Sequence, residues 1–301
     1  MSAAQTIGFI GLGVMGGPMC RNMAKKHAGR VLMLDREAAA VAALSDTKAE
    51  AAASLEALAV ASDVIFLSLP GGPQVEAVSA AIAQAARPGA TIVDLSTTPV
   101  ALARSVAGRL KAKGFAFADA PVARTREAAQ RGELSIMVGA EAAVFARIKP
   151  LLDYIGSDVT HCGEVGCGQV VKLINNALVF EHTLALAEMM VVGERAGVKP
   201  ETLLSAVSKG SGDSFVLRNH GTKAMLPRNF PDKAFPPEYV LKDLDYVLQL
   251  AADTGVRPGV AELARRYYDA ACRHGLSGRY FPGVIEFIEQ GGVPDDGQTK
   301  A

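Results

Sequence analysis

The chain has 301 residues, in which 31 lysines and arginines balance 31 aspartates and glutamates, and half of all residues are hydrophobic. This length is sufficient for two domains, and the composition is typical of a globular protein. A formal net charge of zero excludes the overall basic character that attracts nucleic acid or an anionic membrane, so any recognition of an anion must be local.

The four cysteines show neither a CxxC pair nor the spacing of metal ligands. Cys162 and Cys167 are close enough in sequence to approach each other, but we expect four reduced thiols and no metal site. The first residues, M-S-A-A-Q-T, contain no basic segment or cleavage site of a signal peptide. We therefore expect a cytoplasmic protein.

The first half of the chain alternates short apolar runs with alanine-rich amphipathic segments. The expected strands are Thr6–Ile10, Arg30–Leu34, Val64–Leu69, Thr91–Asp94, Phe115–Asp119 and Leu134–Gly139. The expected helices between them include Gly16–Lys25, Glu37–Leu44, Pro73–Ala86 and Pro99–Lys113. This alternation predicts an α/β fold in which a parallel sheet is covered on both faces. Right-handed crossovers then give the doubly wound Rossmann fold that binds dinucleotides.

The pattern changes near Gly163, where strand signals of comparable strength end. A long helix is expected over Gln169–Ala196, ended by Gly197. Further helices are expected over Glu201–Ser208, Pro237–Thr254, Gly259–His274 and Phe281–Gln290, and the tail from Gly291 should fray. The sequence therefore predicts a Rossmann domain over residues 1–164 and an all-α domain over residues 165–301, joined by the long helix.

The long helix is the most apolar segment of the chain. Its stretch from Val170 to Val192 is interrupted by a lysine, two asparagines, a histidine and two glutamates. A bilayer span tolerates few such residues, so we expect a buried helix of a soluble protein and no membrane.

A glycine-rich segment, G11-L-G-V-M-G16, follows the first expected strand and opens the first expected helix. In this setting the glycines allow a tight turn and a close approach to a pyrophosphate at the helix N-terminus. The expected cofactor contacts are Gly11, Leu12, Gly13, Val14, Met15 and Gly16.

Asp35, at the end of the second strand, is placed to accept hydrogen bonds from the adenosine ribose. Its carboxylate would repel the 2′-phosphate of NADP, whereas the neighbouring Arg36 would attract it or stack on adenine. We therefore expect NAD, with NADP as the alternative.

Two further pairs, Leu69-Pro70 and Ser96-Thr97, stand at the C-terminal ends of expected strands. Those ends border the crevice in which ligands bind in such sheets, so we expect contacts with the nicotinamide riboside. The alternative is that they are ordinary turn residues.

Lys172 and Asn176 lie four residues apart in G166-C-G-Q-V-V-K-L-I-N-N176. Because four residues make just over one helical turn, the ammonium and the carboxamide share one face of the long helix. Polar side chains on an apolar helix are unfavourable unless they bind a partner, so we expect them to contact a ligand.

Four segments together carry a resemblance to a known family: G8-F-I-G-L-G-V-M-G-G-P-M19, D119-A-P-V122, the segment Gly166–Asn176 and K242-D-L-D245. In order and spacing they resemble the β-hydroxyacid dehydrogenase family, of which 3-hydroxyisobutyrate dehydrogenase is the best-known member. The resemblance covers nearly the whole chain. It implies a Rossmann domain, a helical domain and an active site between them, with Lys172 catalytic, Asn176 contacting substrate and Lys242 near the nicotinamide. Family members are dimers or tetramers, so a homodimer or homotetramer is expected.

The implied roles agree with elementary chemistry. Hydride transfer to an aldehyde builds negative charge on oxygen, which an ammonium stabilises and protonates. In the oxidative direction a neutral Lys172 would accept the hydroxyl proton, and desolvation in a closing cleft should lower its pKa toward the working range.

One segment departs from the family pattern. The family usually continues D-A-P-V with Ser-Gly-Gly, which binds the substrate carboxylate, whereas this chain reads Ala123-Arg124-Thr125. This substitution resembles the sulfolactaldehyde reductase branch, in which the arginine holds a sulfonate, and a guanidinium suits such an oxyanion. The alternative is that Arg124 faces solvent or another subunit.

The sequence thus predicts an NAD-dependent oxidoreductase acting on a small anionic β-hydroxyacid or semialdehyde. The candidate substrate classes are 3-hydroxyisobutyrate, γ-hydroxybutyrate with succinic semialdehyde, and sulfolactaldehyde. Two alternatives are an imine reductase-like enzyme and a non-catalytic nucleotide-binding regulator on the same fold. The presence of Lys172 argues against both, because imine reductases usually lack a lysine here and a regulator would be marked by its loss.

Overall fold

The computed structural model describes residues 5–232 and 234–294, and the expectations for the first four residues and for residues 295–301 fall outside this range. The chain divides into two compact units between Lys172 and Leu173. The predicted boundary lies at residues 164 and 165. The difference arises because the first residues of the long helix, although helical, are bonded to the sheet of the N-terminal unit.

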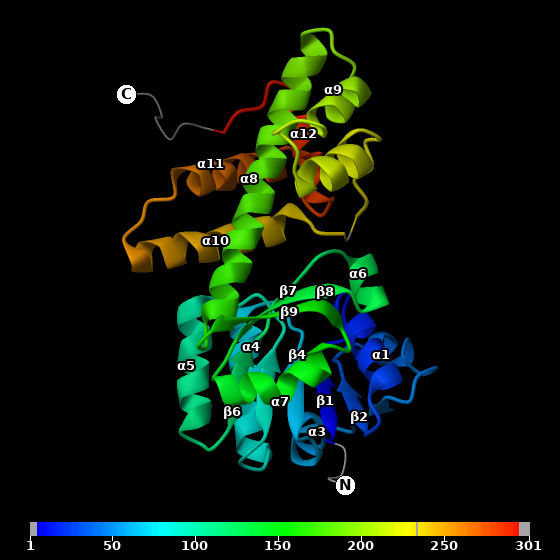
Figure 1. The fold of residues 1–301 in the computed structure, drawn as a ribbon, viewed down its shortest axis with the longest axis vertical. Helices are drawn as coiled ribbons and strands as arrows, with labels where there is room; N and C mark the ends of the chain where they lie inside the picture. Colours follow the sequence, from blue (N-terminus) through cyan, green and yellow to red (C-terminus); the bar gives the residue numbers. More distant parts are fainter. Residues whose placement is uncertain (1–4, 233, 295–301) are drawn as a thin grey trace. The chain divides into compact units, whose positions relative to one another are not determined.

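The N-terminal unit is built on a nine-stranded sheet in the order β3-β2-β1-β4-β5-β6-β8-β7, with β9 also paired to β8 (Figure 1). The strands are β1 (Ile7–Ile10), β2 (Val31–Leu34), β3 (Glu50–Ala51), β4 (Val64–Leu67), β5 (Thr91–Asp94), β6 (Ala116–Asp119), β7 (Val122–Ala123), β8 (Leu134–Gly139) and β9 (Gly156–Gly163). The strands from β3 to β6 are parallel, as the sequence predicts.

The expectation of a wholly parallel sheet is wrong at one end. β8 pairs antiparallel with both β6 and β7. Only two residues, Ala120 and Pro121, separate β6 from β7, and a six-residue helix separates β7 from β8. The chain therefore lacks the length of a full crossover there, and a parallel connection is not available.

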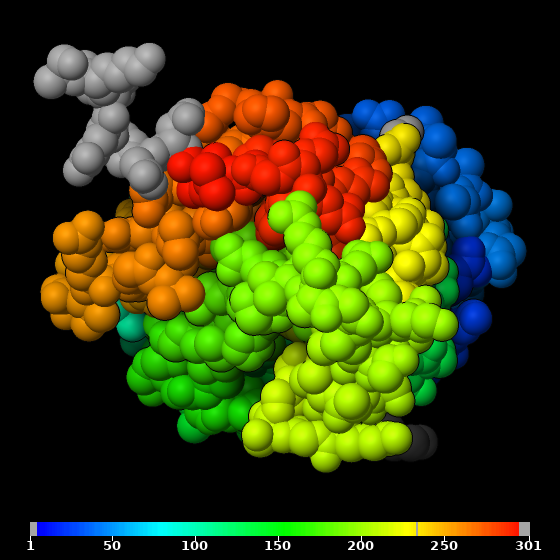
Figure 2. All heavy atoms as spheres, turned by 90° about the horizontal axis from the view of Figure 1, so that it is seen from above, coloured from blue at the N-terminus to red at the C-terminus, as the bar shows by residue number. Residues whose placement is uncertain are grey.

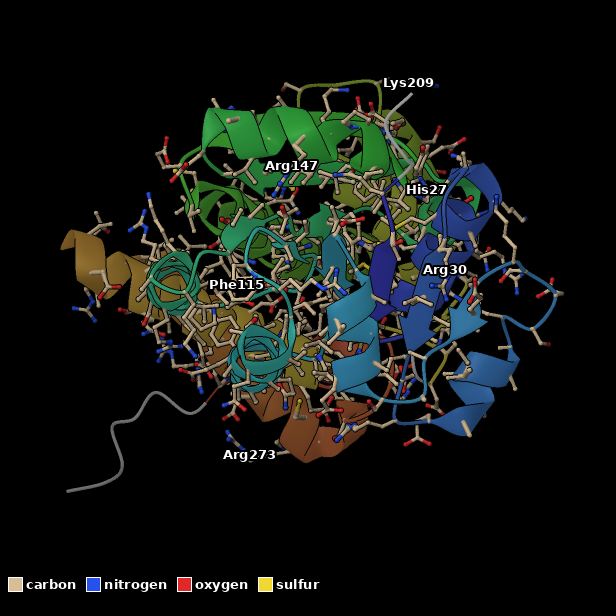
Figure 3. The ribbon with its side chains drawn as sticks, turned by 90° about the horizontal axis from the view of Figure 1, so that it is seen from below. His27, Arg30, Phe115, Arg147, Lys209 and Arg273 are labelled. Atoms are coloured by element: carbon tan, nitrogen blue, oxygen red, sulfur yellow. The ribbon has the colours of Figure 1, made fainter. Side chains whose placement is uncertain are left out.

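Helices cover both faces of this sheet. They are α1 (Gly16–Lys26), α2 (Ala38–Ala42), α3 (Leu55–Ala61), α4 (Gly72–Ala85), α5 (Val100–Lys111), α6 (Arg126–Arg131) and α7 (Ala142–Leu152). One hydrophobic cluster joins α1, α6 and α7 to one face, and another joins α3, α4 and α5 to the other. The strands serve both clusters because alternate residues point to opposite faces, as with Phe66 in the first cluster and Ile65 in the second. Phe115, in the second cluster, lies beside helices seen end-on in Figure 3.

The sequence pattern missed β3, β7 and β9 and the helices α3, α6 and α7. β9 is the instructive case, because its G-S-D-V-T-H-C-G segment is mostly exposed at the side of the sheet. A strand without a buried face has no hydrophobic alternation to detect.

The described residues of the C-terminal unit form helices joined by turns and loops, with no strand. Its elements are α8 (Cys167–Arg195), which begins in the N-terminal unit, α9 (Pro200–Val207), η1 (Leu217–Met225), α10 (Pro237–Thr254), α11 (Gly259–Ala271), η2 (Cys272–Leu276), η3 (Phe281–Gly283) and α12 (Val284–Glu289). Figure 2 draws atoms of this unit as spheres, coloured from yellow-green through orange to red. The expected helices are confirmed, and the π-helical segment η1 was missed.

Helix α8 contributes one face to the hydrophobic core of this unit. Phe180, Leu184, Ala187 and Met190 place one of its faces in the single hydrophobic cluster that also contains residues of η1, α10, α11 and α12. Among the described residues it is the one helix long and apolar enough to cross a membrane by length and composition alone, and 39% of that window is buried inside the molecule.

Candidate active site

The glycine segment forms the turn between β1 and α1 at the C-terminal end of β1. Gly11 has a φ of +94°, and a Cβ added to it would collide with the backbone oxygen of Ser68 after β4. A Cβ on Gly16 would collide with the backbone oxygen of Gly11. The fold itself therefore requires Gly11 for its backbone conformation and its close approach, and Gly16 for its close approach alone.

Gly13 differs from the other two glycines. A Cβ at this position would meet nothing within 4 Å, and both Gly13 and Val14 are exposed. The open space lies where β1 and β4 part, at the point where strand order reverses and such sheets bind dinucleotides. The loop at the N-terminus of the eleven-residue helix α1 thus fits a pyrophosphate.

Asp35 follows β2 and reaches this loop. Its Oδ2 accepts a hydrogen bond from the Leu12 N–H at 2.5 Å, and its Oδ1 accepts one from the Glu37 N–H at 2.8 Å. The carboxylate therefore holds the glycine loop against the end of β2. Each carboxylate oxygen can accept a further bond, so contact with ribose hydroxyls stays a prediction, as does the role of the exposed Arg36.

The pairs after β4 and β5 are joined to each other. The buried Ser96 hydroxyl accepts a hydrogen bond from the Leu69 N–H at 2.9 Å, which ties the two strand ends together. Pro70 is exposed and Thr97 is partly exposed at the same edge of the sheet. Ser96 thus has a structural task here, and contact of these pairs with the nicotinamide riboside stays a prediction.

A buried carboxylate anchors the start of α8 to the sheet. Asp119, the last residue of β6, accepts hydrogen bonds from the Gly166 N–H at 2.6 Å and from the Gln169 N–H at 2.8 Å. Gly139 and Gly168 allow this approach, since a Cβ on either would collide with the Asp119 carboxylate. Backbone N–H groups at a helix N-terminus have no partner within the helix, so this carboxylate satisfies groups that would otherwise be buried and unpaired.

Gln169 extends the anchor to the end of β5. Its amide Oε1 accepts from the Thr98 N–H at 3.0 Å and its Nε2 donates to the Ser96 carbonyl at 2.8 Å. Asp94 accepts in turn from the Ser96 N–H at 2.9 Å and from the Thr98 hydroxyl at 2.7 Å. The ends of β5 and β6 and the first turn of α8 are thus joined in one buried polar network.

The two carboxylates of this network are electrostatically unusual. Burial raises the pKa of Asp94 to about 6, against the hydrogen bonds from Thr98 and Ser96. Burial likewise raises the pKa of Asp119 to about 6, against the backbone bonds from Gly166 and Gln169. Desolvation is the dominant cause in both cases because the charged form loses its water.

Lys172 lies on α8 three residues beyond Gln169, and its side chain is partly buried. Its position is therefore set by the anchored first turn of the helix. Asn176 lies four residues further along the same helix and is buried. The prediction that the two residues share one helical face follows from the unbroken helix.

Asn176 is oriented by a residue of α10. Its Nδ2 donates to Oδ2 of the buried Asp243 at 2.7 Å. A carboxylate only accepts, so the Asn176 amide must turn its NH2 group toward Asp243. The other Asp243 oxygen lies 3.2 Å from the ammonium of Lys242, which also lies over the rings of Tyr239 and Tyr246. The structure thus brings Asn176 and Lys242 together through Asp243.

Arg124 is bound within the N-terminal unit. Its guanidinium donates to the Glu133 carbonyl at 2.7 Å, to the Ser157 hydroxyl at 2.8 Å and to the Asp158 carboxylate at 2.7 Å. Its φ of 87° is rare for a residue with a Cβ. In this conformation the side chain ties β7 to the strand β9, so a substrate anion would have to compete with Asp158 for it.

The neighbours of Arg124 are also accounted for. Ala123 is buried in β7, and the Thr125 hydroxyl accepts a long hydrogen bond of 3.4 Å from the Ala128 N–H at the start of α6. Thr125 itself is exposed. Contact of these residues with substrate remains a prediction.

Sequence reasoning missed four residues that organise the site: Asp94, Asp119, Gln169 and Asp243. Asp119, Gln169 and Asp243 stand in segments that carried the family resemblance, without an assigned role. The signal was a charged or amide residue at the end of an apolar strand or within an apolar helix, where burial requires a polar partner.

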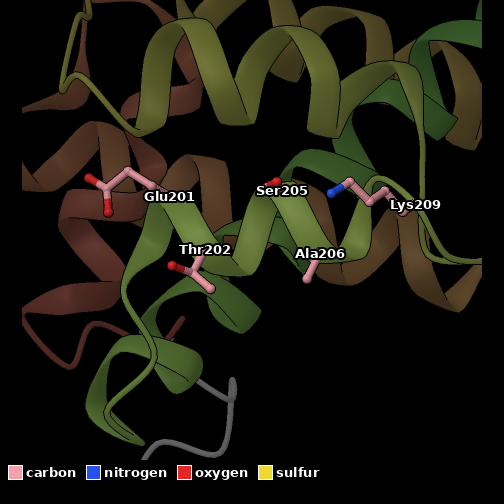
Figure 4. Close-up of a pocket in the computed structure, with 5 residues that line it drawn as sticks. All are labelled: Glu201, Thr202, Ser205, Ala206 and Lys209. Atoms are coloured by element: carbon pink, nitrogen blue, oxygen red, sulfur yellow. The ribbon is translucent and has the colours of Figure 1, made fainter.

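The hollow shown in Figure 4 is separate from these residues. It is a surface depression along α9 lined by Glu201, Thr202, Ser205, Ala206 and Lys209. None of the predicted site residues lines it. Among the described residues no cluster of histidine, cysteine, aspartate and glutamate could hold a metal ion, and the four cysteines are free thiols.

Comparisons with known proteins agree with the two-part architecture. The family model for the NAD binding domain of 6-phosphogluconate dehydrogenase matches residues 6–163. The model described as NAD-binding of NADP-dependent 3-hydroxyisobutyrate dehydrogenase matches residues 166–288. Together the two models span both the glycine loop and the long helix.

Curated relatives and solved structures match along most of the chain. It is 35% identical to 2-(hydroxymethyl)glutarate dehydrogenase of Eubacterium barkeri, over 96% of this chain and 97% of the relative. It is also 35% identical to 2-hydroxy-3-oxopropionate reductase of Escherichia coli, over 81% of this chain and 84% of the relative. The structure of Mycobacterium tuberculosis 3-hydroxyisobutyrate dehydrogenase with L-serine superposes with a TM-score of 0.85 at 26% identity, covering 95% of this chain and 99% of that one.

Two glycine substitutions should separate cofactor binding from folding. Gly13→Ala adds a methyl group to open space, so the fold should be retained while the affinity for NADH falls at least about tenfold. Gly16→Ala forces a collision with the Gly11 oxygen and should lower the free energy of unfolding by about 1–3 kcal/mol. Fluorescence titration with NADH and urea unfolding measure the two effects. Unchanged NADH affinity in Gly13→Ala would contradict the placement of the cofactor.

Two isosteric substitutions test the anchor of α8. Asp119→Asn replaces one of the two accepting oxygens with an NH2 group that faces a backbone N–H donor, so we expect a loss of about 2–3 kcal/mol in unfolding free energy and weaker activity. Asp94→Asn is the matched control, because its amide oxygen can still accept from Ser96 while its NH2 donates to the Thr98 hydroxyl. It should cost less than about 1 kcal/mol. Equal losses in the two variants, measured by urea unfolding, would show that the anchor is not specific.

Proposed function

Because this chain belongs to the β-hydroxyacid dehydrogenase family, we propose that it transfers a hydride between NAD(H) and a small anionic β-hydroxyacid or its semialdehyde, with Lys172 as general acid and base. It is an oxidoreductase that binds a nicotinamide dinucleotide. The observation that carries the proposal is the buried network that fixes the first turn of α8, and therefore Lys172, at the carboxyl ends of β5 and β6.

Each residue has a task that follows from its surroundings. The bound nicotinamide supplies or accepts the hydride. Lys172 protonates the oxygen that develops negative charge at the substrate carbonyl, and in oxidation it accepts the hydroxyl proton. Asn176 donates to Asp243 and accepts from the Asn175 amide, so its remaining N–H is presented to the substrate in one fixed orientation. Lys242 completes the positive surroundings of the nicotinamide.

The relatives' names support the substrate class. 2-(Hydroxymethyl)glutarate and 3-hydroxyisobutyrate carry an alcohol two carbons from a carboxylate carbon, and 2-hydroxy-3-oxopropionate carries an aldehyde there. We infer a substrate of the same pattern, with sulfolactaldehyde and succinic semialdehyde as the variants that a changed anion site would accept. NAD is preferred over NADP in this proposal, since Asp35 stands where a 2′-phosphate would be repelled.

Residue Arg124 is proposed to select the substrate anion together with Thr125. The support is its position two residues after the D-A-P-V segment, which leads out of the Asp119 anchor. Binding an anion costs the ion pair with Asp158, whose partners are about half exposed and which therefore contributes little stability, together with the bonds to the Glu133 carbonyl and the Ser157 hydroxyl.

Purified protein should oxidise NADH with at least one anionic semialdehyde of a panel that also contains a neutral aldehyde and a cyclic imine. Lys172→Ala should lower kcat by at least about 100-fold, because general acid catalysis is removed, and leave the dissociation constant for NADH within about twofold. Lys209→Ala, at an exposed lysine, is the control and should behave as the wild type.

Retained turnover in Lys172→Ala would refute the assignment of the general acid. Turnover with the imine alone would favour the imine reductase alternative, and absence of turnover with every compound would favour a non-catalytic regulator.

The anion role of Arg124 can be separated from its structural role by breaking the same ion pair from either side. Arg124→Ala should raise KM for anionic aldehydes at least about tenfold and leave KM for the neutral aldehyde nearly unchanged. Asp158→Asn removes the competing carboxylate but keeps the guanidinium, so KM for anionic substrates should stay level or fall. If both variants raise KM alike, or if Arg124→Ala affects charged and neutral aldehydes equally, Arg124 serves only to hold β7.

A further inference from the structure

Two cysteines flank the turn that connects β9 to α8. Cys162 is the last residue but one of β9, and Cys167 is the first residue of α8. Both side chains are partly exposed, and neither takes part in the proposed hydride transfer. Accessible thiols that stand next to each other are the usual sites of reversible oxidation in proteins.

A β-bulge changes the direction of the Cys162 side chain. Val138 pairs with His161 and Gly139 pairs with Gly163, so Cys162 is the extra residue of β9. In a regular strand Cys162 and Gly163 would point to opposite faces of the sheet. A bulge interrupts this alternation and redirects a side chain. Cys162 can therefore lie on the same side of the strand as Gly163.

That side of Gly163 faces Cys167. A Cβ added to Gly163 would lie 3.2 Å from the Cys167 Sγ and 3.5 Å from the Cys167 Cβ. Because the Cβ atoms of a disulfide are about 3.5–4.5 Å apart, the neighbour of Cys162 already stands at bridging distance from Cys167. Burial raises the pKa of the Cys162 thiol, and the charges of Asp119 and Cys167 raise it further, which requires both groups to lie nearby.

The turn between the two cysteines can adjust to a bridge. Glycines stand at both of its ends, Gly163 with a φ of +124° and Gly166 with a φ of +94°. Glycine tolerates a wide range of backbone conformations, so small movements here cost little. The Cys162 thiol donates only a long hydrogen bond of 3.6 Å to the Thr160 carbonyl, and a thiol is a weak donor.

We propose that Cys162 and Cys167 form a site of reversible oxidation, at which a small organic disulfide converts the two thiols into a bridge across the turn before α8. The Cys167 thiolate first attacks one sulfur of the small disulfide, whose S–S bond breaks and releases one thiol. The Cys162 thiolate then attacks the Cys167 sulfur and releases the second thiol. Two cysteines are oxidised, the small disulfide is reduced to two thiols, and these take up the two cysteine protons.

The other two cysteines are poor competitors for this reaction. Burial raises the pKa of the Cys20 thiol to about 12. Burial also raises the pKa of the Cys272 thiol to about 11, with a further contribution from the charges of Glu238 and Asp269. Because the thiolate is the nucleophile, both should stay reduced near neutral pH. Cys162, whose pKa is also raised, suits the second step, in which its target is held beside it.

The bridge forms next to the anchor of α8. Gly166 and Gln169, whose N–H groups bond to Asp119, lie on either side of Cys167. Drawing Cys167 toward β9 therefore shifts the first turn of the helix and, five residues further on, Lys172. The effect on turnover rests on the proposed function, whereas formation of the bridge does not.

Mass spectrometry of the intact protein tests the site. After incubation with oxidised glutathione the wild type should lose the mass of two hydrogen atoms, and peptide mapping should place the bridge between Cys162 and Cys167. Cys162→Ser should stop at the mixed disulfide, with one glutathione on Cys167. Cys272→Ser is the control and should form the bridge as the wild type does. Reduction with dithiothreitol should reverse each change.

Two outcomes of this test overturn the proposal. One is a wild type that keeps both thiols open to alkylation after the treatment. The other is glutathione on Cys20 or Cys272 in place of the bridge.

Turnover with NADH and a semialdehyde tests the consequence. The oxidised wild type should have a kcat at least about tenfold lower than the reduced protein, because a shift of about 1 Å in a catalytic group costs up to about 100-fold. Cys167→Ser can form neither the bridge nor the mixed disulfide, so its kcat should not change under the same treatment. An unchanged kcat in bridged wild type would refute the effect on Lys172. Absence of turnover in the reduced protein would count against the proposed function and leave the mass measurement valid.

Discussion

The position of the long helix depends on one buried carboxylate. Asp119 ends strand β6 and accepts from two backbone N–H groups at the start of α8, in a space that Gly139 and Gly168 keep open. A helix of 29 residues that began without such an anchor would leave unpaired donors inside the protein, at a cost of about 1–3 kcal/mol each. The same two bonds fix where the helix leaves the sheet, and therefore where every residue on its first turns lies.

The anchored turn links the chemistry to the fold. Gln169 bonds the turn to the Ser96 carbonyl, and Ser96 bonds the loop after β4, so the edge of the sheet that borders the glycine loop belongs to one network. Lys172 follows on the same helix, and Asn176 after it is turned by Asp243 from α10. α8 thus carries the two proposed catalytic groups and also contributes to the core of the helical unit, which makes its rigidity a condition of both stability and activity.

Much of the architecture could be predicted because local signals were strong. Six buried strands with helices between them predicted the Rossmann fold, and the glycine segment in its strand-to-helix setting predicts the dinucleotide site. The short or exposed elements escaped prediction: β9 has no buried face to give alternation, and the two-residue strand β7 exists only because β8 lies beside it. The antiparallel end of the sheet follows from connection length, which a pattern of apolar runs does not weigh.

The sequence by itself determined the family, the two-part organisation, the cofactor class and the helix that carries Lys172 and Asn176, since each rests on residues close together in the chain. Only the tertiary structure decided which side chains bond to the start of this helix and to Asn176. Asp119 meets Gly166 across 47 positions, and Asn176 meets Asp243 across 67. It also decided that Arg124, which the sequence predicts to hold a substrate anion, is bound to Asp158 across 34 positions. A buried charge needs an opposite charge or a hydrogen-bond donor, because it has lost its water. The fold determines which residue supplies that partner, and the separation of the two residues along the chain does not predict it.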